Sequence, residues 1–139
     1  MALLVGGVVA VSGCAGGNEP QLAIMEGAHA KLPSWVSEPA GLPVDDLAHV
    51  ADRDHLSVFA SRDGDGLWCV ILAIEPTSDG SDWAAGANCA PSDRFATEGV
   101  WVEAASSARG GGAWLLPDDF GGEIGDDWKR INDNLAIHR

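Results

Sequence analysis

The chain has 139 residues, with 8 basic against 21 acidic side chains, a formal net charge of −13 and an isoelectric point near 4.3. A negative charge of this size repels phosphate backbones, so the composition argues against nucleic acid as a partner. The length suits one domain with one hydrophobic core. The acidic residues attract cations or basic peptides, or simply keep the surface soluble, and the second interpretation is the simpler.

The N-terminal run Ala2–Val11 contains no charged residue. Its length of about ten residues matches the apolar region of a signal peptide and is shorter than the roughly 20 residues that span a membrane. Two small residues and then Cys14 follow, and the motif Val11-Ser12-Gly13-Cys14 resembles the lipobox of bacterial lipoproteins. The alternative is an ordinary buried N-terminal strand or helix that is followed by an unmodified cysteine.

The resemblance to bacterial lipoproteins implies cleavage between Gly13 and Cys14 and attachment of lipid to the Cys14 thiol, which anchors an extracytoplasmic protein to the cell membrane. It divides the chain into a signal peptide (1–13), a lipid anchor with a flexible tether (14–43) and a β-rich globular domain (44–139). Signal peptides begin with a basic region, and no basic residue precedes the apolar run. We therefore expect a start codon slightly upstream to supply one.

The three cysteines support export of the protein. If Cys14 carries lipid, then Cys69 and Cys89 remain as a pair, and thiols outside the cytosol oxidise. Neither of the two belongs to a Cys-x-x-Cys motif, and no histidine lies at zinc-finger spacing from either, which disfavours a metal site. We therefore predict a disulfide between Cys69 and Cys89.

The first part of the mature chain is rich in glycine and proline, which favours a tether. Its apolar residues are able to dock on the domain, and they are Leu22, Ile24, Met25, Trp35 and Val36. The stretch that follows Pro43 places Leu47 and Val50 three residues apart, which predicts one or two helical turns capped by aspartates.

A β-hairpin is the strongest local prediction. Apolar and polar residues alternate from Leu56 to Ser61, an Asp-Gly turn follows, and the apolar run Leu67–Ile74 resumes. Because the second strand is apolar at every position, we expect both of its faces to be covered and its place to be central in a sheet. Cys69 lies within it.

The remainder of the chain predicts further short elements. These are a loop (Glu75–Asn88), a turn or single helical turn (Ala90–Phe95), a third strand (Val100–Glu103), a glycine-rich turn (Arg109–Gly112), a fourth strand (Ala113–Leu116), a helical turn that holds Trp128 and Ile131, and a closing strand (Leu135–Ile137). The predicted fold class is α+β and mostly β, a small antiparallel meander sheet with one or two short helices and a disulfide.

The order of these features also resembles small uncharacterised extracytoplasmic proteins of actinobacteria. The resemblance rests on a strand with a cysteine, a polar loop, a Cys-Ala-Pro turn before Phe95, and the segments Glu98–Val102 and Trp114–Asp118. It covers about half of the chain. It implies a shared β domain closed by a disulfide, and it implies nothing about chemistry.

Acidic clusters are the first place to look for a metal site. Asp63-Gly64-Asp65-Gly66 begins like a calcium loop, but the fifth and twelfth positions are Leu67 and Ile74, which offer no side-chain oxygen. A hairpin turn explains these residues better. A second cluster, Asp118, Asp119, Glu123, Asp126 and Asp127, favours a solvated loop over a weak cation site. The sequence predicts no metal and no cofactor.

No catalytic set is apparent either. The four histidines, His29, His49, His55 and His138, lie in no recognisable signature, and no Gly-x-Ser-x-Gly motif occurs. The run Gly110–Gly112 lacks the Gly-Lys-Ser/Thr ending of a phosphate loop.

The six tryptophans, without any tyrosine, are the remaining candidates for binding. Trp68 belongs to the apolar strand and is predicted to lie in the core, whereas alternation places Trp101 and Trp114 opposite the apolar residues of their strands. These two, with Trp83 of the long loop, either fill a small core or form an exposed face that binds a sugar or a protein.

Two main hypotheses for function follow, and a purely structural or stress-related envelope component is a third that the sequence does not separate from the first. The first is an envelope-anchored lipoprotein that acts as a non-enzymatic binding or interaction module, with the membrane as a partner through Cys14 and with an envelope protein or glycan as its ligand. The alternative is a small extracytoplasmic hydrolase with a site built from carboxylates, for which we expect a deep pocket lined by two carboxylates or a histidine.

Overall fold

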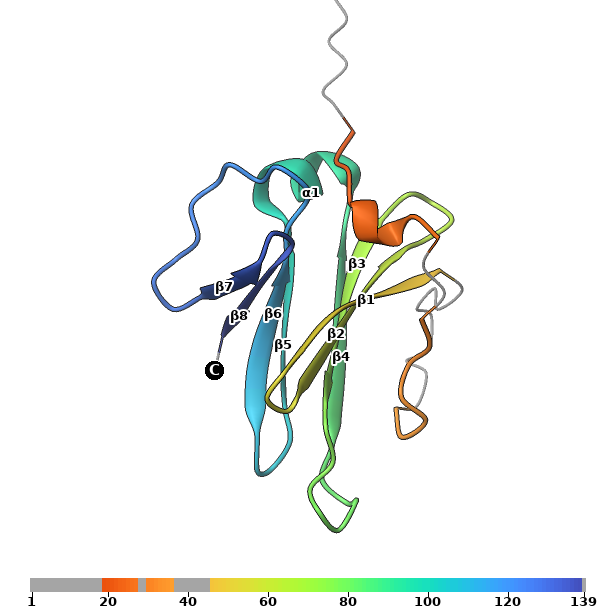
Figure 1. The fold of residues 1–139 in the computed structure, drawn as a ribbon, viewed down its shortest axis with the longest axis vertical. Coiled ribbons are helices and arrows are strands. Elements are labelled where there is room, and N and C mark those ends of the chain that lie inside the picture. The colour runs from red at the N-terminus through yellow and green to blue at the C-terminus, as the bar shows by residue number, and fades with distance from the viewer. Residues whose placement is uncertain (1–18, 28–29, 37–45, 139) are drawn as a thin grey trace, which may run out of the picture.

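The computed structural model describes residues 19–27, 30–36 and 46–138, which form two antiparallel β-sheets and one short α-helix (Figure 1). Each sheet has four strands. The fold is α+β and mostly β, as the sequence predicts. Within the described ranges, no helix combines the length and the apolar character needed to cross a membrane.

The first sheet is a meander, because its strands follow one another in chain order. It contains β1 (Leu47–Arg53), β2 (Leu56–Arg62), β3 (Trp68–Ile74) and β4 (Ala84–Ala90). The predicted β2–β3 hairpin and the internal position of β3 are confirmed, and every residue of β3 is buried. The carboxylate of Asp63 accepts hydrogen bonds from the backbone N–H groups of Asp65 and Leu67, so Asp63–Gly66 is the turn of this hairpin.

The second sheet has the strand order β5-β6-β8-β7. Its strands are β5 (Val100–Ala105), β6 (Gly110–Leu115), β7 (Lys129–Asn132) and β8 (Leu135–His138). The predicted third, fourth and closing strands are confirmed as β5, β6 and β8. The predicted glycine turn is wrong, since Gly110–Gly112 belongs to β6 and the turn lies before it, where the Ser106 N–H donates to the Arg109 carbonyl.

The two sheets pack face to face around the main core, and a smaller buried cluster of Leu47, Phe59 and Ile71 is separate from it. Alternate residues of each strand point inward, because successive side chains of a strand leave opposite faces. Val58, Val70 and Leu72 from the first sheet thus meet Val102, Leu115 and Ile137 from the second. The helix α1 (Ser92–Glu98) closes one end of the sandwich, at the top of Figure 1. There the buried Phe95 stacks on Trp68 with ring centroids 4.9 Å apart, which confirms the predicted core position of Trp68.

The two sheets pack tightly where β4 faces β5. A Cβ added at Gly86 would lie 3.2 Å from Cγ2 of Val102, so the absence of a side chain permits this spacing. Two residues later, the Nδ2 of Asn88 donates a hydrogen bond of 2.9 Å to the carbonyl of Trp101. This bond ties the edge of one sheet to the backbone of the other and fixes the position of β5.

Parts of the predicted tether lie against the domain. Leu22, beside the short 3-10 helix η1 (Ala23–Met25), is buried in the main core, and Val36 is also buried, so the docking predicted for these residues is found. Ala30 donates its N–H to the carbonyl of Leu47 at 2.9 Å. The other predicted features of the N-terminal region, the signal peptide and Cys14, lie outside the described residues.

The disulfide between Cys69 and Cys89 is present and joins two neighbouring strands. The two residues lie directly opposite each other in the β3–β4 ladder, with their Cα atoms 4.1 Å apart. The sequence prediction of a loop over Glu75–Asn88 is wrong in its second half, since Ala84–Ala90 forms β4. The disulfide therefore links strand to strand and does not pin a loop.

Two predicted helical turns are strands. The helical turns expected at Leu47 and Val50 are replaced by β1, and the turn expected at Trp128 and Ile131 is replaced by β7. Both strands carry a β-bulge, with a register shift between His49 and Ala51 in β1 and between Arg130 and Asn132 in β7. A bulge inserts one residue and breaks the alternation by which a strand is recognised.

Candidate functional site

The outer surface of the second sheet carries a cluster of aromatic side chains, named here the aromatic face. Its members are Trp101, Trp114, Phe120, Trp128 and His138. Alternation along β5 buries Val100 and Val102 and leaves Trp101 pointing outward, with 47% of its surface exposed. Trp114 lies directly opposite Trp101 in the β5–β6 ladder, and their rings meet edge to face with centroids 5.8 Å apart.

Trp114 is held in place by the end of the helix α1. Its indole Nε1 donates a hydrogen bond of 2.7 Å to the carbonyl of Glu98. The next residue, Gly99, has a φ of 69°, and a Cβ at that position would lie 2.7 Å from the same Nε1. A glycine at the end of the helix therefore makes room for the indole, and the central ring of the aromatic face has a fixed orientation.

The third tryptophan reaches the face from the loop between β6 and β7. The ring of Trp128 lies 5.4 Å from that of Trp114, at an interplanar angle of 71°, and 5.4 Å from the ring of His138. Phe120, from the same loop, is 6.3 Å from Trp114. These edge-to-face contacts are the geometry that aromatic quadrupoles favour, so each ring helps to fix its neighbours.

Two polar side chains lie on the same side of the sheet. Glu103 follows Trp101 by two residues on β5 and so shares its face. The Oε1 of Glu103 is 3.9 Å from Nδ1 of His138, which is longer than a hydrogen bond, and the side chains are 64% and 35% exposed. A carboxylate and an imidazole on the same side of the sheet as the exposed indole of Trp101 can bind hydroxyl or amino groups of a ligand.

Trp83 does not join this face. It is 36% exposed, and its ring packs edge to face against Trp35 with centroids 5.9 Å apart. Of the three tryptophans that the sequence singled out, the structure brings Trp101 and Trp114 together and leaves Trp83 apart. Phe120, Trp128 and His138 are members that the sequence did not indicate.

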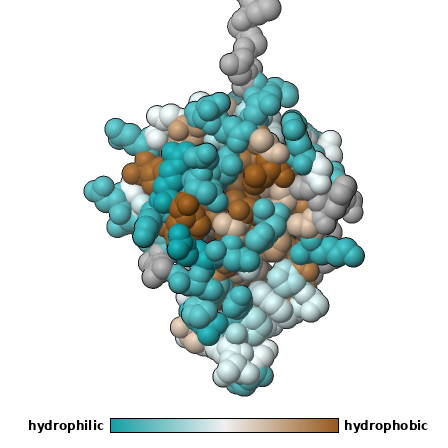
Figure 2. Space-filling model, viewed as in Figure 1, coloured by the Kyte–Doolittle hydropathy of each residue, from teal (hydrophilic) through white to brown (hydrophobic). Residues whose placement is uncertain are grey.

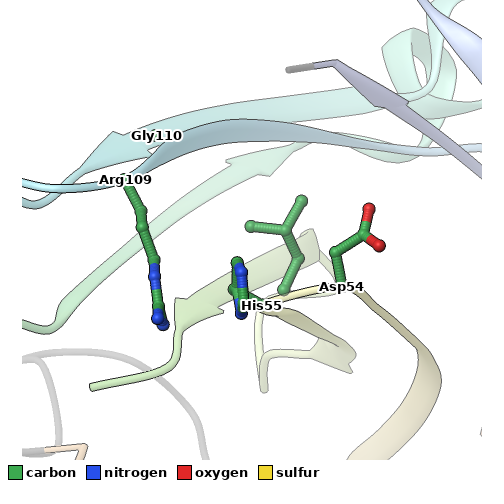
Figure 3. Close-up of a pocket in the computed structure, with 5 residues that line it drawn as sticks. Asp54, His55, Arg109 and Gly110 are labelled. Carbon is green, nitrogen blue, oxygen red and sulfur yellow. The ribbon is translucent and has the colours of Figure 1, made fainter. Parts of the chain in front are cut away.

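A hollow of about 380 Å³ lies beside the β1–β2 turn and is lined by Asp54, His55, Leu56, Arg109 and Gly110 (Figure 3). Figure 3 shows the His55 ring between the side chains of Arg109 and Asp54. The Nη1 of Arg109 donates to the carbonyls of Glu75 and Pro76, at 3.1 and 3.3 Å. Arg109 therefore ties the β3–β4 loop to the start of β6.

A second hollow, of about 430 Å³, lies where residues 19–21 meet the end of β6. Three carboxylates, from Glu19, Asp118 and Asp119, are among its lining residues. Asp118 uses both oxygens for structure, since Oδ2 accepts from the Ala23 N–H at 2.9 Å and Oδ1 accepts from Nδ2 of Asn134 at 2.8 Å. This carboxylate holds the N-terminal segment on the domain.

The carboxyl groups with shifted pKa values lie away from the aromatic face. Hydrogen bonds from the side chain of Thr77 and from Ser81 lower the pKa of Asp79 to about 2. Hydrogen bonds from the side chain and backbone of Ser107 and from the Ala108 N–H lower the pKa of Asp82. Burial raises the pKa of Asp52, but hydrogen bonds from His49 and Ser57 outweigh it, and the net shift is downward. The shifts of Asp79 and Asp82 arise from contacts in loops and turns, whereas that of Asp52 arises from contacts in the strands β1 and β2.

The other predicted candidates are placed as follows. In the part of the chain that the structure describes, no three histidine, cysteine or acidic side chains group as a metal site. The Nε2 of His49 lies 2.8 Å from Oδ1 of Asp52, and His29 falls outside the described ranges.

No protein family, curated protein or solved structure matches the chain.

Proposed function

We propose that the protein is an envelope-anchored lipoprotein whose domain acts as a non-enzymatic binding module. Cys14 carries the lipid and holds the protein at the cell membrane on its extracytoplasmic side. The aromatic face contacts the ligand. The Cys69–Cys89 disulfide supports an oxidising location, since such bonds form and persist mainly outside the cytosol.

The observation that carries this proposal is the exposure of Trp101 on a rigid surface. Large apolar side chains at the surface of a monomeric domain mark interaction sites when they occur together. Here the indole of Trp101 is 47% exposed and packs against the ring of Trp114. A polar side chain at this position would favour solubility more. Figure 2 shows that apolar patches on the visible surface are small and separated by polar residues. The exposed indole of Trp101, together with the half-buried rings that contact it, is the observation that favours a binding surface on this sheet.

Lipid attachment is tested by labelling. Wild-type protein that is expressed in a bacterial host with a radioactive or clickable fatty acid is expected to take up label and to sediment with membranes. Cys14→Ser is expected to lose both properties. A wild-type protein without label would contradict the lipoprotein assignment.

Binding is tested with the full chain carrying Cys14→Ser, which removes retention through lipid. This protein is expected to be retained on delipidated envelope material from its source cells, and Trp101→Ala is expected to abolish that retention. Trp83→Ala is the matched control, since it removes an exposed indole elsewhere on the domain. Equal retention of the two variants would exclude the aromatic face as the binding surface.

A small hydrolase is the alternative, and the hollow beside Asp54 and His55 is the feature that favours it. Histidine and carboxylate side chains are the groups that most often act as general acids and bases in enzymes. Release of a chromophore from ester and glycoside substrates, lost in His55→Ala, would support this alternative over the binding module.

A further inference from the structure

We infer that the ligand of the aromatic face is a neutral saccharide chain, an inference that rests on the proposed function and names its ligand class. One face of a pyranose ring presents C–H groups, and its rim presents hydroxyl groups. Such a ligand needs a flat aromatic surface with hydrogen-bonding side chains beside it. Trp101, Glu103 and His138 supply these on one side of the second sheet.

The aromatic part of the site is Trp101. The face of an indole is the negative side of its quadrupole, and it attracts the slightly positive C–H groups of a sugar ring. The ring of Trp101 packs against that of Trp114 with centroids 5.8 Å apart and an interplanar angle of 66°, and Trp114 is itself hydrogen-bonded to the carbonyl of Glu98. This contact restricts the rotation of Trp101. A fixed platform reduces the conformational entropy that is lost when a ligand binds.

The polar part of the site is the pair Glu103 and His138. Their nearest nitrogen and oxygen atoms are 3.9 Å apart, so the two groups do not hydrogen-bond directly. The Glu103 carboxylate can accept hydrogen bonds from sugar hydroxyls, and such bonds to a charged acceptor are stronger than neutral ones. These contacts give direction to a ligand that stacking alone would leave free to rotate.

Charge decides the kind of saccharide. The chain carries a net charge of −13, and Glu103 lies two residues from Trp101 on the same strand. The loop that brings Trp128 to the face contains Glu123, Asp126 and Asp127, and the strand that follows it begins with Lys129 and Arg130. Arg130 pairs with Ala136 and so lies on the same side of the sheet as Trp114. With Glu103, these residues are four acidic against two basic, so the local balance is negative. Polymers that carry phosphate, sulfate or uronic acid groups are repelled by this field. The net negative charge of these residues therefore favours a saccharide that carries no acidic groups.

The exposed aromatic area suits a small ligand. A tryptophan side chain offers at most about 250 Å², so 47% exposure of Trp101 leaves roughly 120 Å². The other rings of the face are half-buried. The exposed aromatic surface therefore matches one or two sugar rings, and the protease arm of the test below distinguishes a protein ligand from a saccharide.

The test uses polysaccharide from the envelope of the source cells, freed of lipid and protein and separated by anion exchange into a neutral and an anionic fraction. The full chain with Cys14→Ser is run through gels that contain each fraction. We expect the neutral fraction to retard the protein and the anionic fraction to leave its mobility unchanged. Trp101→Ala should weaken the retardation at least tenfold, Glu103→Gln severalfold, and Trp83→Ala not at all.

Three results would overturn the inference. They are the absence of retardation by the neutral fraction, equal retardation by the anionic fraction, and equal effects of Trp101→Ala and Trp83→Ala. Protease treatment of the envelope separates this inference from the proposed function. Retention that depends on Trp101 and is destroyed by protease would leave a binding module with a protein ligand. If Trp101→Ala did not lower retention on envelope material at all, with or without protease treatment, the aromatic face would not be a binding surface, and the proposed function would fail as well.

Discussion

The indole of Trp128 occupies the space that a side chain at Gly112 would fill. A Cβ built at Gly112 would lie 3.0 Å from Cη2 of Trp128 and 3.3 Å from Cβ of His138. Gly112 is therefore the position on the aromatic face that leaves room for the ring of a loop residue. The loop between β6 and β7 is held over the sheet through this contact.

Gly112→Ala is expected to displace Trp128 and to destabilise the fold by about 1–3 kcal/mol, the usual cost of overpacking. Gly110→Ala is the matched control on the same strand, because a Cβ there would meet Cβ of Ala105 at an ordinary 3.6 Å. Urea unfolding monitored by tryptophan fluorescence measures both. Equal stability of the two variants would contradict the packing of Trp128 on Gly112.

Gly99→Ala is expected to be more damaging, with a loss of about 3 kcal/mol or more, because it combines backbone strain with a steric clash. Gly99 has φ 69° and ψ −162°, a region that is essentially restricted to glycine. An added Cβ would also collide with the carbonyl oxygen of Leu115 and the indole of Trp114. Thermal unfolding of the purified variant checks this, and a melting temperature like that of the wild type would refute it.

Elements with a clear local sequence pattern were predicted correctly, and elements that depend on tertiary contacts were not. The β2–β3 hairpin was predictable because alternation, an Asp-Gly turn and an uninterrupted apolar run all agree. The strand β4 was missed because its residues, AAGANCA, include no β-branched or aromatic side chain. It forms a strand through pairing with β3 and the disulfide to Cys69, which are tertiary contacts.

The bulged strands were missed for a different reason. In β1, Ala48 and Ala51 are three residues apart, yet their partners Ala60 and Val58 are two residues apart, because the bulge adds one residue. A spacing of three mimics the period of a helix. The outward direction of Trp101 and Trp114 was predictable from alternation, whereas the arrival of Trp128 depends on the path of a loop.

Removal of the disulfide tests its contribution to stability. The double variant Cys69→Ala with Cys89→Ala opens a loop with a sequence separation of 20 residues, for which chain entropy predicts a loss of about 3 kcal/mol. Reductant should lower the stability of the wild type by a similar amount and leave the double variant unchanged. Peptide mass mapping without reductant should find the two cysteines linked. Two free thiols in the protein purified under oxidising conditions would contradict the structure.

Acid is expected to loosen the end of the sandwich where the β3–β4 loop meets the β5–β6 turn. The pKa of Asp79 is lowered to about 2, and that of Asp82 is also lowered. A lowered carboxyl pKa stabilises the fold above the unfolded value of about 3.8, and this stabilisation disappears as pH falls through the folded value.

Asp82→Asn is therefore expected to lower the melting temperature at pH 6, and this difference from wild type should vanish as the pH approaches 2. Asp65→Asn, in the β2–β3 turn, is the control. Melting curves between pH 2 and pH 6 measure the effect. A difference between Asp82→Asn and wild type that stays constant with pH would show that the charge of Asp82 is irrelevant to the contact.

Trp101→Ala is expected to leave the fold intact, because nearly half of this side chain is exposed and its hydrogen bond to Asn88 is made by the backbone carbonyl. We expect a loss in unfolding free energy of about 1–3 kcal/mol, because the substitution removes the buried half of the side chain and its contact with Trp114. Urea unfolding checks it. A larger loss of stability would mean that Trp101 serves the fold, and its exposure would then require no ligand.

The most direct test of the aromatic face as the binding surface is an NMR titration of the six indole N–H signals. The full chain with Cys14→Ser, labelled with ¹⁵N and assigned through Trp→Phe variants, is titrated with enzymatically solubilised envelope polysaccharide. The signals of Trp101, Trp114 and Trp128 should shift together and saturably, while those of Trp68 and Trp83 stay in place. Shifts confined to Trp83, or no shift at all, would contradict the account.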